Sequence, residues 1–207
     1  MPLDARLAEL NRTLCGKVKS SELAVLQRAA MLVRKSGILE RSLQEGETAP
    51  NIEISGEGGD TTLYQLLERG PVVLNFYRGS WCAFCRAELQ AFEQVLPELK
   101  ALKATYLAIS PQGLSGGDSP DCCIVKDLDN RIARAFGIQY TLSADNRALL
   151  ESWGLDLSKL HGCERVELPL PATYVIGRDR TVVFRYVDVD FRKRFDPQQL
   201  VEILRGL

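Results

Sequence analysis

The chain has 207 residues, enough for one domain with a sizeable core and too few for a large multidomain enzyme. Its 26 basic and 27 acidic side chains give a net charge of −1, so no excess of positive charge attracts nucleic acid. Charged side chains interrupt residues 1–14, where a signal peptide needs an apolar stretch, and no apolar run approaches the ~20 residues of a membrane helix. We therefore expect a cytoplasmic protein with neither nucleic acid nor membrane as a partner.

Residues 3–36 predict two amphipathic helices. Apolar residues recur every three or four positions from Leu3 to Leu14 and again from Leu23 to Val33. A polar linker follows these helices. We therefore divide the chain into a helical N-terminal extension, residues 1–45, and a domain, residues 46–207. Such a helical pair more often packs on its own domain than on a partner, and we expect the same here.

From residue 51, short apolar runs alternate with helical stretches, which is typical of an α/β domain with a central sheet. The predicted strands are 51–54, 72–77, 105–110, 123–126, 173–176 and 182–187. The predicted helices are 63–68, 82–102, 130–136, 146–153 and 197–204. Pro97 should kink or divide the longest helix because proline removes a backbone donor. The residues at 177–180 predict an antiparallel hairpin between the last two strands.

The pair Cys82 and Cys85 follows a predicted strand and opens the longest helix. The unpaired N–H groups and the dipole of a helix N-terminus stabilise a thiolate there. The three-residue spacing places both sulfurs on one face, so that they can close a disulfide after one has attacked a peroxide or another disulfide. Arg78 and Arg86 add positive charge nearby. This context predicts thiol redox chemistry.

A CxxC pair is also half of a zinc site, but a structural zinc site needs four ligands. Cys122 and Cys123 are adjacent rather than spaced as a chelate, Cys163 is isolated, and His161 is the only histidine. We therefore expect no metal. His161 is expected at the surface, and we assign no role to these three cysteines or to Cys15. Six cysteines are too few for a disulfide scaffold.

Residues 76–89, FYRGSWCAFCRAEL, resemble the active-site stretch of the peroxiredoxin-like branch of the AhpC/TSA family, within the thioredoxin-fold superfamily. Residues 108–112 and 171–176 resemble two further blocks, and the helical extension is similar as well. The resemblance implies an α/β, thioredoxin-like fold with a central mixed sheet flanked by helices. It also implies a cis proline at Pro171 facing the cysteines, although the local sequence alone favours a trans proline entering a strand.

The resemblance gives the cysteines two competing roles. In a thioredoxin pattern, Cys82 is the exposed nucleophile and Cys85 resolves the mixed disulfide. In a peroxiredoxin pattern, Cys85 takes the peroxide-reactive position and Glu88 the acidic one. Here Arg78 stands where that pattern has proline, Cys82 where it has threonine, and Pro171 where many members have a peroxide-polarising arginine. Arg78 is our candidate substitute for that arginine.

The resemblance implies an antioxidant enzyme that reduces hydroperoxides through a Cys82/Cys85 dithiol cycle, regenerated by a thioredoxin- or glutaredoxin-like reductant. The alternative is a thiol-disulfide oxidoreductase acting on protein disulfides, for which Trp81, the CxxC pair and Pro171 suffice. A third alternative is a redox-sensing module whose disulfide state changes the N-terminal helices. None of these needs a metal, flavin or nicotinamide, and the sequence has no phosphate-binding glycine motif at a strand end. The resemblance also makes a homodimer an expectation.

Overall fold

The computed structural model describes residues 1–56, 59–112, 123–162 and 166–207. Its helices are α1 (Leu3–Lys17), α2 (Ser20–Lys35), α3 (Ile38–Arg41), α4 (Leu63–Leu67), α5 (Ala83–Ala101), the 3-10 turn η1 (Leu128–Asn130), α6 (Arg131–Ala135), α7 (Ala144–Ser152), α8 (Leu157–His161) and α9 (Gln199–Arg205). Its strands are β1 (Glu53–Gly56), β2 (Gly59–Thr62), β3 (Val72–Phe76), β4 (Thr105–Ser110), β5 (Cys123–Lys126), β6 (Gln139–Thr141), β7 (Glu167–Pro169), β8 (Ala172–Ile176) and β9 (Val182–Val187).

A five-stranded mixed sheet in the order β5-β4-β3-β8-β9 forms the centre of the domain. The strand β3 pairs parallel with β4 and antiparallel with β8, with Phe76 opposite Ala172. All five residues of β3 are buried, as expected for a central strand covered on both faces. The cysteine-containing turn therefore begins at the carboxyl end of the central strand.

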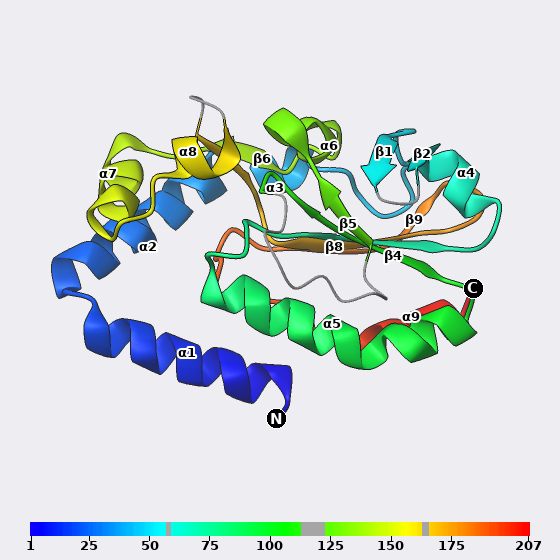
Figure 1. Cartoon of the computed structure of the whole chain (residues 1–207), viewed down its shortest axis with the longest axis horizontal. Coiled ribbons are helices and arrows are strands. Elements are labelled where there is room, and N and C mark those ends of the chain that lie inside the picture. Colours follow the sequence, from blue (N-terminus) through cyan, green and yellow to red (C-terminus); the bar gives the residue numbers. More distant parts are fainter. Residues whose placement is uncertain (57–58, 113–122, 163–165) are drawn as a thin grey trace.

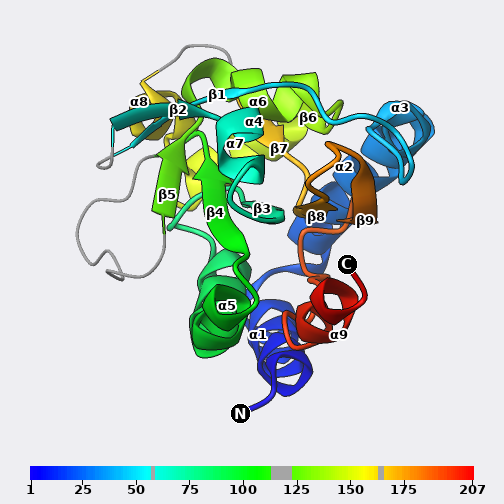
Figure 2. The same ribbon diagram turned by 90° about the vertical axis from the view of Figure 1, so that its right-hand side faces the viewer.

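Alternate residues of β3 enter two separate cores. Val72, Leu74 and Phe76 join the cluster on the face covered by α4 and α6, whereas Val73 and Tyr77 join the cluster on the face covered by α5 and α9. This is the period of two that places successive strand side chains on opposite faces. Figures 1 and 2 show α5 and α9 together beneath the sheet, and α4 and α6 above it.

The N-terminal helices pack on the rest of the chain, as expected. Leu3 and Leu7 of α1 are buried in the cluster that contains α5 and α9, and α1 runs along α5 in both views (Figures 1 and 2). The helix α2 contacts α7, where Trp153 Nε1 donates to Glu22 Oε1 at 3.1 Å. Gly37, with φ of 71°, follows the end of α2. The two predicted helices are confirmed.

Most predicted elements are present, and β4, β5 and β9 have the predicted bounds. The hairpin between β8 and β9 is also confirmed. The helix α5 continues through Pro97 rather than dividing there. Short elements that have no periodic signal were not predicted, namely β2, β6, β7, α3 and α8. No helix in the described ranges is both long and apolar enough to cross a membrane.

Candidate active site

The turn after β3 places Cys82 at the N-cap of α5 and Cys85 in its first turn, as the sequence predicts. Gly79 has φ of 143°, a backbone conformation that residues with a Cβ rarely adopt, and the Cys82 N–H donates to the Gly79 carbonyl at 3.2 Å. Ser80 N–H donates to Gln112 Oε1 at 3.1 Å. The turn is thereby held against the end of β4.

Both thiols are reduced and nearly inaccessible: Cys82 is 5% exposed and Cys85 is fully buried. The pKa of Cys82 lies well below the usual thiol value, chiefly because the Cys85 thiol donates a hydrogen bond to it and also because Arg78 and Arg194 are positively charged. Burial raises the pKa of Cys85 well above the usual value. The shifts thus favour a thiolate at Cys82 and a neutral thiol at Cys85.

Arg194 lies under the pair and was not anticipated from the sequence. Its Nη2 is 3.3 Å from Cys85 Sγ, and its Nη1 is 2.6 Å from Glu88 Oε2. Both charged side chains are buried, with 0% and 1% exposure. Nε and Nη2 also donate to the Phe191 carbonyl at 3.0 and 2.9 Å. These contacts fix the guanidinium in one orientation, as a buried ion pair requires.

Glu88 is a buried carboxyl group on the face of α5 that points toward the sheet. Burial raises its pKa to about 7, against the opposing effect of Arg194. Asn75 of β3 lies on the same side and lowers the pKa of Glu88 by a hydrogen bond. The Cys85 sulfur therefore faces a cation whose counter-ion holds a proton more tightly than an ordinary carboxylate does.

Arg78 covers the other side of Cys82. Its guanidinium carbon is 4.7 Å from the ring centroids of both Trp81 and Phe191, so the cation lies between two aromatic side chains. The residue is 3% exposed, and its Nε has no hydrogen-bond partner. Its positive charge is one of the causes that lower the pKa of Cys82. Arg86, the other arginine proposed from sequence, is exposed and donates to the Ser80 carbonyl at 2.6 Å.

His161 is buried rather than at the surface, so that expectation was wrong. It ends α8, which packs over the site, and only 8% of it is exposed. Burial and the charge of Arg78 lower its pKa to about 4, so the imidazole is neutral at pH 7. Its Nε2 has no hydrogen-bond partner. Because a lone histidine in a loop gave no periodic signal, the sequence could not reveal this burial.

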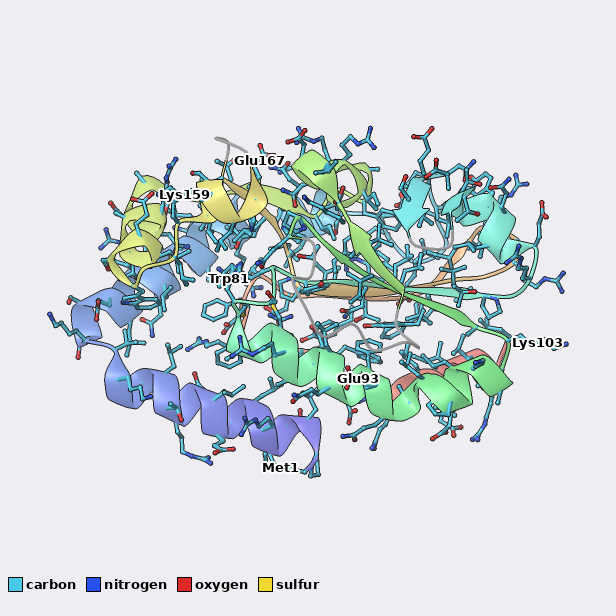
Figure 3. All side chains as sticks on the ribbon, viewed as in Figure 1. Met1, Trp81, Glu93, Lys103, Lys159 and Glu167 are labelled. Carbon is cyan, nitrogen blue, oxygen red and sulfur yellow. The ribbon has the colours of Figure 1, made fainter. Side chains whose placement is uncertain are left out.

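Trp81 is the residue directly before Cys82. It packs against both the α5 core and the small cluster formed by the α7–α8 segment. Figure 3 shows Trp81 at the end of α5 where the helix begins, below the α8 ribbon. The α7–α8 segment therefore lies next to the turn that carries the cysteines.

Pro171 lies directly before β8, and its peptide bond is trans. No peptide bond among the described residues is cis, so the cis geometry implied by the resemblance was wrong and the locally favoured trans form is present. Pro171 is buried directly before β8, one residue beyond the pair formed by Phe76 and Ala172. Its carbonyl accepts from the Asp188 N–H at 3.2 Å. It thus lies beside the start of the cysteine-containing turn.

The remaining cysteines lie apart from this arrangement or outside what can be described. Cys15 is exposed on α1. Cys122 and Cys163 fall outside the described residues, and Cys123 begins β5. Within the described ranges no group of three histidine, cysteine or acidic side chains is placed to hold a metal ion.

Residues 46–185 match the AhpC/TSA family. The thiol-disulfide oxidoreductase ResA of Bacillus thuringiensis is 23% identical over 159 residues, 76% of this chain and 78% of its own. The chloroplastic peroxiredoxin Q of Triticum aestivum is 25% identical over 165 residues, 79% of this chain and 66% of its own. The crystal structure of peroxidoxin BcpB from Mycobacterium tuberculosis superposes with a TM-score of 0.56 at 20% identity, covering 80% of this chain and 98% of that one.

At this level of identity, the structural likeness establishes the thioredoxin-like fold. The family match covers more than half of the chain and includes β3, the cysteine pair, Glu88 and Pro171. Arg194 lies beyond the matched residues, so its position beside Cys85 is a feature of this structure and is not carried over from the family match. The chain belongs to the AhpC/TSA family and is a peroxiredoxin-like, thiol-dependent oxidoreductase.

Proposed function

We propose that the protein reduces hydroperoxides through a dithiol cycle in which Cys82 attacks and Cys85 resolves. The observation that carries this assignment is the opposed ionisation of the pair: the pKa of Cys82 is lowered and that of the fully buried Cys85 is raised. A thiolate is the nucleophile in such chemistry. The assignment departs from the peroxiredoxin pattern, in which the position of Cys85 reacts with peroxide.

In the first step, the Cys82 thiolate attacks the terminal peroxide oxygen, the O–O bond breaks, and the leaving alkoxide takes up one proton. The products are the sulfenic acid at Cys82 and an alcohol, or water from hydrogen peroxide. The Cys85 thiol then displaces this hydroxyl group, which forms the Cys82–Cys85 disulfide and releases water. A thioredoxin- or glutaredoxin-like dithiol restores both thiols and leaves as its own disulfide.

Two cations support this cycle. Arg78 is close enough to stabilise the thiolate and the charge that develops on the peroxide, and preorganised donors of this kind contribute about 3–4 kcal/mol each in other enzymes. Arg194 stabilises the Cys85 sulfur when it loses its proton in the resolving step. We place the reaction in the cytoplasm, because a reducing compartment returns the pair to thiols between cycles.

The test is oxidation of the fully reduced protein by one equivalent of hydrogen peroxide, with mass mapping of the cysteines. Rapid formation of a Cys82–Cys85 disulfide is expected. Cys85→Ser should accumulate a sulfenic acid at Cys82, whereas Cys82→Ser should react slowly, and Cys15→Ser is the matched control with unchanged kinetics. Rapid formation of a sulfenic acid at Cys85 in the Cys82→Ser protein would reverse the two roles. Slow oxidation of the wild-type protein, spread over several cysteines, would reject peroxidase activity.

Disulfide exchange with protein substrates is the second candidate function. An N-cap cysteine of low pKa followed by a buried cysteine also suits attack on a disulfide, and the ResA relative is named as a thiol-disulfide oxidoreductase. Reduction of insulin by the protein together with an external dithiol measures this activity directly. Turnover of insulin faster than that of hydroperoxide would favour the second function over the first.

A further inference from the structure

A cavity of about 330 Å³ lies between the N-terminal helices and the β6–α7 segment, and neither the dithiol chemistry nor the family match accounts for it. Its size is at the lower end of the ~300–1,000 Å³ typical of small-molecule sites. The lining residues come from α2, α3, β6 and the start of α7.

One wall of the cavity is apolar. It consists of aliphatic side chains from two turns of α2 and the start of α3, principally Leu32, Val33 and Ile38. Leu32 is 50% exposed, so part of its aliphatic side chain is open to water. Hydrocarbon placed against this wall would remove apolar surface from water, which is favourable.

The opposite wall is polar, and the positive side chain of Arg41 lies at the edge of the cavity. Asn146 is 6% exposed, and its Oδ1 has no hydrogen-bond partner. An unpartnered polar atom at such depth is costly. Rotation of the amide by half a turn presents Nδ2 instead, so this side chain can serve an acceptor or a donor. The first turn of α7 opens here, with Ser143 Oγ accepting from the Asn146 N–H at 3.3 Å.

Arg41 supplies the charge at the edge of the cavity. Its Nη1 donates to the Ser36 carbonyl, which fixes the guanidinium near the end of α2. No ion pair joins it to a carboxylate among the residues that the structure describes, although Glu40 and Asp145 are close in sequence to the lining residues. A planar guanidinium with free N–H groups matches a carboxylate in two-point geometry.

We propose that this cavity binds a small aliphatic carboxylate, whose hydrocarbon lies against Leu32, Val33 and Ile38 and whose carboxylate lies between Arg41 and Asn146. The apolar wall excludes a bare phosphate or sulfate as the best ligand, since such an ion leaves that wall uncovered. The site belongs to both the N-terminal extension and the domain, so a bound acid links α2 and α3 to β6 and α7. The inference is independent of the proposed peroxidase function.

Isothermal titration of the full-length protein at pH 7.5 tests the site with three probes: hexanoate, octanoate and hexan-1-ol. We expect one molecule of either acid to bind, octanoate more tightly than hexanoate, and the alcohol at least about tenfold more weakly than hexanoate, the change expected from losing one charged contact of about 1.4 kcal/mol. Equal affinity for hexan-1-ol and hexanoate, or no binding of either acid, would overturn the proposal.

Two neighbouring residues of α2 provide a matched pair of variants. Leu32 lines the cavity and is 50% exposed, whereas Met31 is 47% exposed and does not line it. Leu32→Glu should repel the acid and weaken octanoate binding at least about tenfold, while Met31→Glu should leave it unchanged. Arg41→Gln, an exposed substitution, should cause a similar loss. Equal affinities of the Leu32→Glu and Met31→Glu proteins would place the ligand elsewhere and refute the site.

Discussion

The guanidinium of Arg194 contacts the sulfur of Cys85 at 3.3 Å, although 109 residues separate them in the chain. The contact joins the segment between β9 and α9 to the first turn of α5. The same segment carries Phe191, whose ring lies under Arg78 and packs edge-on against Phe84 at 5.6 Å. One short segment outside the sheet thus supplies a charge to one cysteine and supports the cation that stabilises the other.

Removing the charge of Arg194 should destabilise the protein and slow the resolving step. Arg194→Leu leaves Glu88 buried without its partner, and breaking such a pair costs about 3–5 kcal/mol. Chemical denaturation measures this loss. In stopped-flow oxidation, formation of the Cys82 sulfenic acid should be affected less than its conversion to the disulfide, since Arg194 contacts Cys85 directly.

The double variant Arg194→Leu with Glu88→Leu separates folding from chemistry. Replacing both members of a buried ion pair by apolar side chains is often neutral or stabilising, so the double variant should recover most of the lost stability. It should not recover the rate of disulfide formation. Full recovery of that rate would show that Arg194 acts only as the counter-ion of Glu88.

Arg78 should control the ionisation of Cys82. Arg78→Met keeps an unbranched side chain between Trp81 and Phe191 but removes the charge, so the pKa of Cys82 should rise and peroxide oxidation should slow about 100-fold, the effect of losing one donor worth about 3 kcal/mol. The pH dependence of thiolate absorbance gives the pKa. Arg86→Met, at an exposed arginine one turn along α5, is the control and should change neither quantity.

The central fold was predictable because its signals are local. Strand β3 shows as a mostly apolar run, and α1 and α2 show a helical period, each within a few residues of the observed bounds. The elements that were missed, such as β6 and β7, have three residues each and form only because they pair with one another. Tertiary pairing of this kind leaves no periodic pattern in either segment.

The site was only half predictable for a related reason. The thiol pair and Arg78 lie within one stretch of chain, so spacing and context revealed them. Arg194 and His161 reach the site from segments far along the chain, through packing that only the folded structure specifies. The geometry of Pro171 shows the limit of resemblance, because the local preference for a trans proline held.

Gly79 should tolerate no side chain. A Cβ at this position would lie 2.5 Å from both Gln112 Oε1 and Trp81 Nε1, in a backbone conformation with φ of 143°. Gly79→Ala should therefore displace the turn, lower the midpoint of thermal unfolding and raise the pKa of Cys82. Gly154→Ala is the matched control: its φ is 80° but nothing lies within 4 Å of the added carbon. It should show only the smaller backbone cost of about 1 kcal/mol. Equal effects on the Cys82 pKa would contradict the steric argument.

Two buried groups should give opposite pH dependences of stability. Glu88, whose pKa is raised from 4.5 to about 7, binds more protons in the folded state, so its contribution is largest below pH 4.5 and is lost as the pH rises to 7. His161, whose pKa is lowered from 6.5 to about 4, binds fewer protons when folded, so its contribution is present above pH 6.5 and is lost as the pH falls to 4. Each shift corresponds to about 3 kcal/mol.

Between pH 4.5 and 6.5 the two contributions oppose each other in the wild-type protein, and single substitutions should separate them. Relative to wild type, the free energy of unfolding of Glu88→Gln should rise more steeply with pH from 4.5 to 7. The reason is that the variant lacks the Glu88 contribution to stability, which falls over this pH range in the wild-type protein. His161→Gln should show the reverse difference, a steeper fall with pH between 4 and 6.5. Urea unfolding at half-unit pH intervals gives both difference curves. A curve parallel to wild type for either variant would mean that the group ionises in the folded protein as it does in the unfolded chain.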